Sequence, residues 1–409
     1  MSEPHRPMGT GPRRRWLVLA AFGSLVCATQ VLWLTFAPIT PQAHDVLGVS
    51  EGAIGDLAAV NPLMYVLLAI PAGRWLDRRF GATLVAGALM TAGGALLRLV
   101  DPSSYATVLV GQLVMSVGQP FVLNASTKIA ARYFPPSQRT AAISVTSAAQ
   151  FAGILVAALT GGTLIDAGGL ELVLGVHAAL AVATAVAVVL ALRVPAGFVT
   201  EAPRSGSLGW LRHDPLMWLL AGLLFVGVGV FNAAATWLDA ILTDLDHPGV
   251  AGALIAIMTV AGIAGAVVLP GLAARYDRHR EVLLATTVTT VVAFAAIALV
   301  HDVVFVGVVL AVEGFMLLAG LPVALDWSEL ESGPDRAGLS TGFLLLAGNL
   351  GGVVFVLVVQ ATIGNPYLAL AAMSALALPG VILAARLPGH ARSHLEDEDV
   401  PQREDSTAT

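Results

Sequence analysis

Twelve apolar runs, each about 20 residues long, recur along this sequence almost from end to end. An α-helix rises about 1.5 Å per residue, so such a run matches a hydrocarbon core about 30 Å thick. The runs lack the ten-residue alternation of polar and apolar residues that the strands of a membrane barrel show. Each run is therefore predicted to be a membrane-spanning helix. The spans are placed near residues 16–38, 53–73, 82–100, 105–128, 139–161, 171–193, 214–238, 250–272, 282–300, 303–325, 338–360 and 367–386.

The composition supports the same fold class. Hydrophobic residues make up 57% of the 409 residues, and charged residues make up 12%, about half their share in soluble domains. A soluble core of this size could not cover so much apolar surface, so lipid must solvate the outer faces of the helices. Abundant Gly and Ala within the spans favour close helix contacts. The predicted fold class is an all-α integral membrane protein of twelve helices.

Charge and motif content exclude several function classes. The net charge is −6, and no basic patch with interleaved aromatic residues is present, so no nucleic-acid partner is expected. The single cysteine, Cys27, excludes a disulfide framework within the chain and a CxxC metal site; we interpret it as a packing residue. No phosphate-binding loop, zinc-ligand spacing or nucleophile elbow occurs. We therefore expect no enzyme, ATP-driven pump, metal or cofactor.

The first apolar run is expected to stay in the protein as a span. Arg13, Arg14 and Arg15 precede it, as they would a signal peptide. The run is longer than the apolar region of a signal peptide, however, and no small-residue cleavage site ends it.

Basic residues fall in alternate loops, which predicts the orientation of the spans. The opposite loops, near 39–52, 162–170, 239–249 and 361–366, carry no Lys or Arg, and only Arg98 falls on their side. An even number of spans then places both termini in the cytoplasm, with the chain in the cell membrane. The basic residues of the cytoplasmic side, besides the four arginines of the N-terminal tail, are Arg74, Arg78, Arg79, Lys128, Arg132, Arg139, Arg193, Arg204, Arg212, Arg275, Arg278, Arg280, Arg336, Arg386, Arg392 and Arg403.

The longest internal loop divides the chain into two sets of six spans. It is rich in Pro, Gly and Ser, and the C-terminal tail carries the acidic run Glu396–Asp399, which is expected to be solvated. The predicted organisation is a tail (1–15), an N-terminal bundle (16–193), a linker (194–213), a C-terminal bundle (214–386) and an acidic tail (387–409).

The two sets of spans carry an internal repeat. The loops between spans two and three and between spans eight and nine both run from a proline and a glycine to an Asp-Arg pair, Asp77-Arg78 and Asp277-Arg278. The loops around Arg139 and Arg336 also correspond. A repeat of six spans in the same orientation predicts two bundles related by a pseudo-two-fold axis, an arrangement suited to alternating access.

The first of these loops resembles the signature G-x-L-a-D-R-x-G-R-R of the major facilitator superfamily. Gly73, Asp77, Arg78 and Gly81 match it in type, although Gly81 lies one residue further on and Ala82-Thr83 replace the trailing basic pair. The resemblance implies two six-helix bundles that rock about a central cavity. It also implies that spans one, four, seven and ten line that cavity.

Further segments resemble the FLVCR-type solute carriers, a branch linked to choline, ethanolamine and haem-related transport. This resemblance implies a small organic solute such as choline, and a tryptophan contact from span one. In that branch an aromatic residue and a glutamine serve near the places of Asn232 and Asn349. The segments are Trp33–Ile39, Gly111-Gln112, Gly118–Asn124, Lys128–Pro135, Gln138–Ala141, Val312–Gly314 and Leu321–Val323.

Polar residues within the spans are the candidates for substrate contacts. Several form stripes at helical spacing, such as Gln112, Ser116 and Gln119, or Asn232, Thr236 and Asp239. Asn124 lies about 140° around the helix from Gln119, so the two cannot face one point. The full set is Gln30 and Trp33 on span one, Gln119 and Asn124 on span four, Gln150 on span five, Asn232 and Thr236 on span seven, Glu313 on span ten and Asn349 on span eleven.

Each candidate also has a structural interpretation. The face of Trp33 can bind a quaternary ammonium by cation–π attraction, or the ring can belong to an interfacial aromatic belt. The Asn and Gln residues can bond either to substrate or between helices. Glu313 is costly as a buried charge. It is either a proton or cation site, or a structural acid that bonds to the backbone of span eleven.

The basic loops are predicted to form a cytoplasmic gate. Asp77 can accept hydrogen bonds from a neighbouring helix N-terminus and from an arginine. For the basic residues, the alternative is that they serve membrane topology alone. The predicted gate residues are Gly73, Asp77, Arg78, Arg132, Arg139, Asp277 and Arg278.

The sequence thus predicts a monomeric secondary transporter, a uniporter or ion-coupled carrier, for a small organic solute. Two alternatives stay open. One is a proton-coupled exporter of drugs or metabolites. The other is a membrane receptor or scaffold that transports nothing.

Overall fold

The computed structural model describes residues 12–198, 209–247, 250–333, 335–362 and 364–389. These residues form helices and contain no strand. The acidic run Glu396–Asp399 and residues 199–208 of the predicted linker lie outside the described residues.

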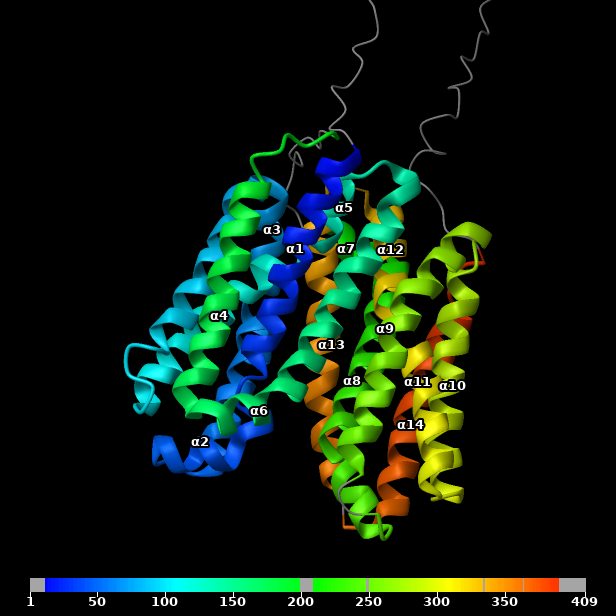
Figure 1. The fold of residues 1–409 in the computed structure, drawn as a ribbon. Coiled ribbons are helices and arrows are strands. Elements are labelled where there is room, and N and C mark those ends of the chain that lie inside the picture. Colours follow the sequence, from blue (N-terminus) through cyan, green and yellow to red (C-terminus); the bar gives the residue numbers. More distant parts are fainter. Residues whose placement is uncertain (1–11, 199–208, 248–249, 334, 363, 390–409) are drawn as a thin grey trace, which may run out of the picture.

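The helices fall into two sets, one before and one after residue 200 (Figure 1). The first set is α1 (Pro12–Trp33), the short 3-10 helix η1 (Ala37–Ile39), α2 (Thr40–Leu47), α3 (Glu51–Leu97), α4 (Tyr105–Leu123), α5 (Ser126–Tyr133) and α6 (Pro136–Ala191). The second set is α7 (Gly209–His213), α8 (Pro215–Asp244), α9 (Ala251–Tyr276), α10 (His279–Leu299), α11 (Val303–Leu317), α12 (Gly320–Ser332), α13 (Ala337–Gln360) and α14 (Pro366–Ala385). We call the two sets the N-half and the C-half.

Ten helical stretches of the described residues are long and apolar enough to cross a membrane. Two of them, of 45 and 56 residues, are more than twice as long as the roughly 20 residues that one crossing needs. Both contain non-helical backbone near the middle, at Arg79 in α3 and at Gly168 and Gly169 in α6. Gly169 has a φ of 68°, a left-handed value that glycine adopts without strain. The two breaks fall where the sequence predicts loops.

The predicted spans four and ten are not continuous helices. Span four consists of α4 and α5, with Asn124 and Ala125 between them, and span ten consists of α11 and α12, with Leu318 and Ala319 between them. Both breaks lie inside the apolar runs from which spans four and ten are predicted. Span one is also shorter than predicted, since α1 ends at Trp33 and is followed by η1 and α2.

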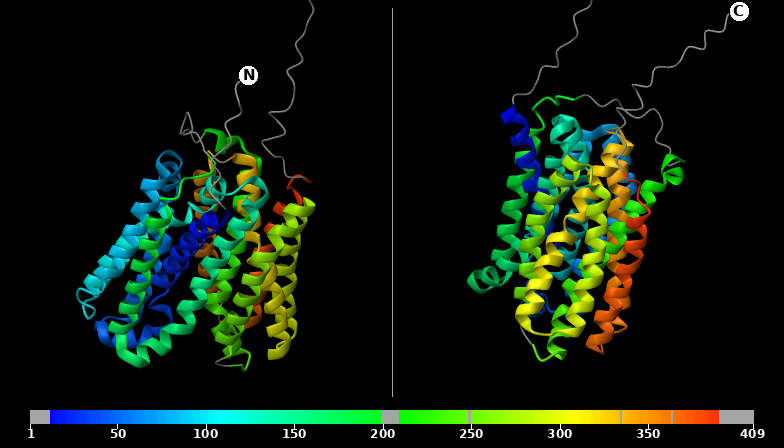
Figure 2. Two further views of the ribbon diagram at one scale, coloured as in Figure 1. Left: turned by 45° about the horizontal axis from the view of Figure 1, so that its top comes forward. Right: turned by 90° about the vertical axis from the view of Figure 1, so that its right-hand side faces the viewer.

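The two halves pack through a few pairs of helices. Within the halves, α3 packs on α4, α1 on α6, α8 on α13 and α9 on α11; between the halves, α3 packs on α13 and α6 on α9. The two sets of helices lie closest at the end that carries α5 and α12 and separate toward the end that carries α2 (Figures 1 and 2). The start of α1 and the last turn of α14 lie at the end where the halves meet (Figure 1).

Glycine permits the close helix crossings. A Cβ atom on Gly351 of α13 would collide with the carbonyl oxygen of Phe225 on α8, and one on Gly314 of α11 would collide with that of Met258 on α9. In a membrane no hydrophobic effect drives helices together, so contacts of this kind supply much of the packing energy.

Arg98, the one basic residue on the predicted outer side, is completely buried. Its guanidinium donates to the Thr35 hydroxyl at 3.3 Å, to the Gln112 side-chain oxygen at 3.1 Å and to the Leu32 carbonyl at 3.4 Å. It therefore joins α1, α3 and α4 inside the N-half rather than adding positive charge to a loop.

Replacing Gly351 by Ala should destabilise the protein, because the added methyl group overpacks the contact with α8. We expect a loss of about 1–3 kcal/mol in unfolding free energy. It would appear as a lower thermal midpoint of the detergent-solubilised protein. Gly252→Ala is the matched control, since a Cβ atom at Gly252 of α9 meets nothing within 4 Å. Equal midpoints for the two variants would contradict the packing described here.

Candidate functional site

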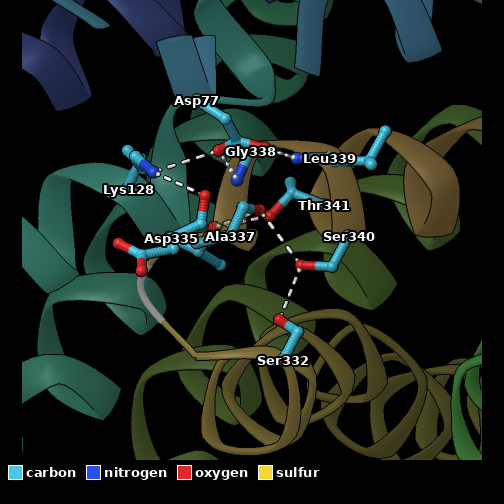
Figure 3. A network of polar contacts seen from close by, with 10 residues as sticks. Asp77, Lys128, Ser332, Asp335, Ala337, Gly338, Leu339, Ser340 and Thr341 are labelled. Atoms are coloured by element: carbon cyan, nitrogen blue, oxygen red, sulfur yellow. Dashed lines mark hydrogen bonds and ion pairs between the residues drawn. The ribbon is translucent and has the colours of Figure 1, made fainter. Parts of the chain in front are cut away.

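One carboxylate of the N-half bonds to the start of a helix in the C-half. Asp77 of the N-half accepts hydrogen bonds from the backbone N–H of Gly338 at 3.0 Å and of Leu339 at 3.1 Å. Both groups belong to the first turn of α13, whose N–H groups have no partner within the helix. The carboxylate thus caps α13 and meets the positive end of its dipole (Figure 3). The predicted bond from Asp77 to a helix N-terminus is present.

Lys128 completes this contact. Its ammonium lies 3.1 Å from Asp77 Oδ1 and donates to the backbone carbonyl of Asp335 in the C-half at 3.0 Å. The side chains of Lys128 and Asp77 are 1% and 5% exposed, so the two charges neutralise each other away from water. The sequence predicts an arginine here, and the structure corrects that expectation to a lysine.

Neighbouring hydroxyl groups extend the contact. The Thr127 hydroxyl donates to the Ala337 carbonyl at 3.0 Å and lies 2.6 Å from the hydroxyl of Thr341. Ser340, one turn into α13, bonds to Ser332 at the end of α12 at 3.2 Å. The threonine bonds tie α5 of the N-half to α13 of the C-half, and the serine bond joins α13 to α12 within the C-half (Figure 3).

Glycine allows α3 and α13 to approach at this point. A Cβ atom on Gly73 would lie 2.6 Å from the Gly338 oxygen, and one on Gly338 would lie 2.8 Å from Asp77 Oδ1. Larger side chains would push the carboxylate away from the helix end. Gly73, a predicted gate residue, therefore acts through the space that it leaves open. We call the contacts of Asp77, Lys128 and Thr127 with α13 the first latch.

A second latch joins the start of α6 to α12. Arg139 Nη1 lies 2.7 Å from Glu329 Oε1, and the Thr140 hydroxyl donates to Asp326 Oδ1 at 2.8 Å. Asp326 and Glu329 are 2% exposed. On its other oxygen, Asp326 meets His279 Nε2 of α10 at 3.0 Å. Asp326 thus connects the N-half to two helices of the C-half.

The remaining predicted gate residues have other described surroundings. Arg78 is exposed, Arg132 stacks over the ring of Phe80, and Arg278 pairs with Glu281 on the exposed surface of its own helix. Asp277, the repeat partner of Asp77, ends α9 in a left-handed conformation and lies 3.8 Å from His279. The repeat in sequence is therefore not a repeat of contacts.

Sequence reasoning missed Thr127, Thr140, Asp326 and Glu329, and it used Lys128 only for topology. A usable signal exists for the two acids. Asp326 and Glu329 are three residues apart just after an apolar run, so they share one helix face. Their partners lie 186 and 190 residues away in the chain, and only the tertiary structure shows them.

Trp33 and Gln30 of α1 lie in different settings. The Trp33 indole N–H donates to the Ala58 carbonyl of α3 at 2.9 Å, and the residue is half-buried. Gln30 is 1% exposed and bonds to the neighbouring Thr29. The Trp33 ring is thus held by its edge.

The polar residues of α4 also differ from each other. Asn124, at the break between α4 and α5, accepts from the Tyr65 hydroxyl and donates to the Ala69 carbonyl at 2.8 Å. It is fully buried, and both ends of its amide are used within the N-half. Gln119 is 5% exposed.

Gln150 and Asn232 lie on the two helices that meet between the halves through an aromatic pair. Their sequence neighbours Phe151 of α6 and Phe231 of α8 have ring centroids 6.4 Å apart in an edge-to-face arrangement. Gln150 and Asn232 are both half-buried. A Cβ atom on Gly352 of α13 would collide with the Asn232 amide.

Three other candidates have local or internal partners. Thr236 is exposed and donates to the Asn232 carbonyl one turn back, and Asn349 donates to the Leu345 carbonyl of its own helix. Glu313 is fully buried, and its Oε1 lies 2.8 Å from the Thr290 hydroxyl of α10. The expected bond from Glu313 to span eleven is therefore replaced by one to span nine. The side chain of Asp239 lies outside the described part of the chain.

The greater part of the sequence matches one family. The family model of the Major Facilitator Superfamily matches residues 21–356. The chain belongs to this superfamily. Solved transporters of the superfamily share the fold. They include the transporter FucP in the outward conformation (TM-score 0.73, 16% identity, 91% of this chain and 99% of that one) and the human organic anion transporter MFSD10 (TM-score 0.76, 15% identity, 92% of this chain and 100% of that one).

Curated relatives resemble the chain over most of its length. Solute carrier family 49 member A3 of Danio rerio is 28% identical over 85% of this chain and 78% of its own. The choline/ethanolamine transporter FLVCR2 of Homo sapiens is 26% identical over 84% of this chain and 71% of its own. These matches confirm the resemblance that the sequence motifs indicate.

Asp77→Asn should open the end of the protein that the latches close. The change removes the charged cap of α13 and leaves the Lys128 ammonium buried without its carboxylate, at a cost of about 3–5 kcal/mol to the closed state. Spin labels at Arg78→Cys and Arg278→Cys, introduced into Cys27→Ser protein, should show a longer distance by double electron–electron resonance. Asp277→Asn is the matched control. If it lengthened the distance as much as Asp77→Asn does, the assigned asymmetry of the gate would be wrong.

Charge exchange tests the second latch. Arg139→Glu and Glu329→Arg should each favour the open end, because each places two like charges together at a buried site. The double variant should restore closure at least in part, by about 1–3 kcal/mol of coupling. The same spin-label distance reports the result. Additive effects of the two changes would contradict a direct pairing.

Proposed function

We propose that the chain is a secondary transporter that moves a small organic solute across the cell membrane by alternating access. The two latches carry this proposal. They consist of buried, charge-assisted contacts between the halves. Burying charges costs free energy. A transporter whose halves separate in its working cycle has a use for such contacts, because they form a closure that can open. The polar contacts named above join residues 77 and 127–140 of the N-half to residues 326–341 of the C-half.

The proposed topology has twelve crossings, with α3 and α6 each crossing twice around their central breaks. Each half then spans the membrane six times, and both termini lie in the cytoplasm, as the distribution of basic residues favours. The bundles comprise residues 16–193 and 214–386 and are joined by the cytoplasmic linker 194–213. The latches then close the cytoplasmic side, so the conformation is outward-facing. The protein acts as a monomer in this proposal.

The solute is proposed to be an organic cation such as choline. The relative FLVCR2 is named a choline/ethanolamine transporter, and this chain has a half-buried tryptophan, Trp33, whose indole N–H is already bonded to Ala58. A ring held by its edge keeps its face free to attract a quaternary ammonium. Gln150 and Asn232, beside the Phe151–Phe231 pair, are the proposed polar contacts from the two halves.

Uptake of radiolabelled choline into proteoliposomes tests this function. Trp33→Ala should reduce uptake about tenfold, because it removes a cation–π attraction worth about 1–2 kcal/mol of binding free energy. Trp33→Phe should retain a larger share. Trp218→Ala is the matched control, because the Trp218 indole also donates to a backbone carbonyl, that of Leu211, but lies on the exposed surface of α8. Inactivity toward choline and a panel of amines would overturn the proposed solute, and equal loss in both alanine variants would overturn the role of Trp33.

A further inference from the structure

Glu313 is a buried acid that the latches and the proposed solute site do not use. It is the eleventh residue of α11, about 15 Å from the outer end of that helix and near the middle of the membrane. Glu313 is 0% exposed and its neighbour Thr290 is 2% exposed. The second carboxyl oxygen, Oε2, has no hydrogen-bond partner among the described residues.

Counting protons shows which form of Glu313 fits this site. The Thr290 hydroxyl lies 2.8 Å from Glu313 Oε1 and 3.0 Å from the Thr286 carbonyl. A hydroxyl has one proton and can donate to only one of these oxygens. If Glu313 is ionised and Thr290 donates to it, the hydroxyl gives up its contact with the Thr286 carbonyl, and Oε2 still has no donor among the described residues. If Glu313 carries a proton, it donates to Thr290, Thr290 donates to Thr286, and both contacts are satisfied.

No charged neighbour compensates an ionised Glu313. The elements packed against α11 are α9, α10 and α12, and their titratable side chains all lie near the cytoplasmic end. These are Arg275 and Tyr276 at the end of α9, with Asp277 directly after it, His279, Arg280 and Glu281 at the start of α10, and Asp326, Glu329 and Glu331 on α12. His279 is eleven residues from Thr290, about 16 Å along α10. A carboxylate without a cation in such a place is strongly disfavoured.

The position of Glu313 connects it to the second latch. It lies five residues before Leu318, where the span breaks, and the helix after the break carries Asp326 and Glu329. When the second latch opens, α12 must move relative to α6, and the break is the point at which α11 and α12 can change their angle. Such a movement can admit water from the cytoplasmic side to Glu313.

We propose that Glu313 is a proton site: it holds a proton while the latches are closed and releases it to the cytoplasm when they open. On release, the O–H bond of Glu313 breaks, the proton passes to cytoplasmic water, and Thr290 turns its hydroxyl from Thr286 to the carboxylate. No electron is transferred. One proton then enters the cell in each cycle. The inference rests on the proposed transport function and adds its coupling ion.

Infrared spectroscopy tests the protonation of Glu313 without any solute. At neutral pH the wild-type protein should show a carbonyl band of a protonated carboxylic acid that Glu313→Gln lacks. Thr290→Val should shift this band, because it removes the hydrogen-bond partner. Thr287→Val is the matched control. The Thr287 hydroxyl lies on the same helix and donates to the Leu283 and Leu284 carbonyls of that helix, so this change should leave the band unchanged. Superimposable spectra of the wild type and Glu313→Gln would overturn the inference.

The spin-label pair at residues 78 and 278 tests the connection to the latches. Raising the pH from about 6 to about 9, on either side of neutral, should increase the open population of the wild type at least threefold more than that of Glu313→Gln. Thr287→Val should follow the wild type. An equal response of the wild type and Glu313→Gln would show that Glu313 is a structural acid. This measurement needs no transported solute. Its outcome therefore tests the proton site whether or not choline is the solute.

Choline flux separates the two proposals. In proteoliposomes with an entrapped pH indicator, choline uptake by the wild type should acidify the lumen. Choline uptake without acidification would overturn the proton site and leave the proposed function in place. Absence of choline uptake, with a Glu313-dependent infrared band and pH response, would overturn choline as the solute and support the proton site.

Discussion

The burial of one carboxylate at the end of one helix organises the closed side of this protein. Asp77 meets two backbone N–H groups of α13 and the ammonium of Lys128 at distances between 3.0 and 3.1 Å. A charge held in this way needs all its partners, because removing any of them leaves a buried charge without compensation. The contact is therefore either complete or absent. A gate between two states requires that property, since a graded contact would leave the pathway partly open to both sides.

The two halves repeat in sequence but contribute different residues to the contacts between them. In the N-half, the loop acid Asp77 reaches α13, while its repeat partner Asp277 stays beside His279 of its own half. The C-half contributes Asp326 and Glu329 from α12 instead. Both latches end on helices next to a break in a span, α5 and α12. Each of these short helices lies at the end where the halves meet (Figure 1).

Hydropathy and charge were sufficient to predict much of the architecture. Lipid is a uniform solvent that offers no hydrogen bonds, so every backbone N–H and C=O within it must be paired inside a helix. The length of each apolar run therefore predicts a helix that crosses the membrane. The breaks at Arg79 and Gly168–Gly169 fall in predicted loops. The breaks in spans four and ten were not predictable in this way. Asn124, Ala125, Leu318 and Ala319 are ordinary residues for a span, and their backbones keep right-handed helical angles.

By itself the sequence determined a helical membrane protein with two like halves and the superfamily to which it belongs, because these properties depend on local composition and spacing. It also identified Asp77, whose acidity in a basic loop has no topological use. Only the tertiary structure decided that Lys128 rather than an arginine pairs with Asp77, that Arg139 meets Glu329, and that Glu313 faces Thr290. Each of these pairs joins residues from different helices. Their meeting depends on the rotation and crossing of whole helices, which the periodicity of a single span does not specify.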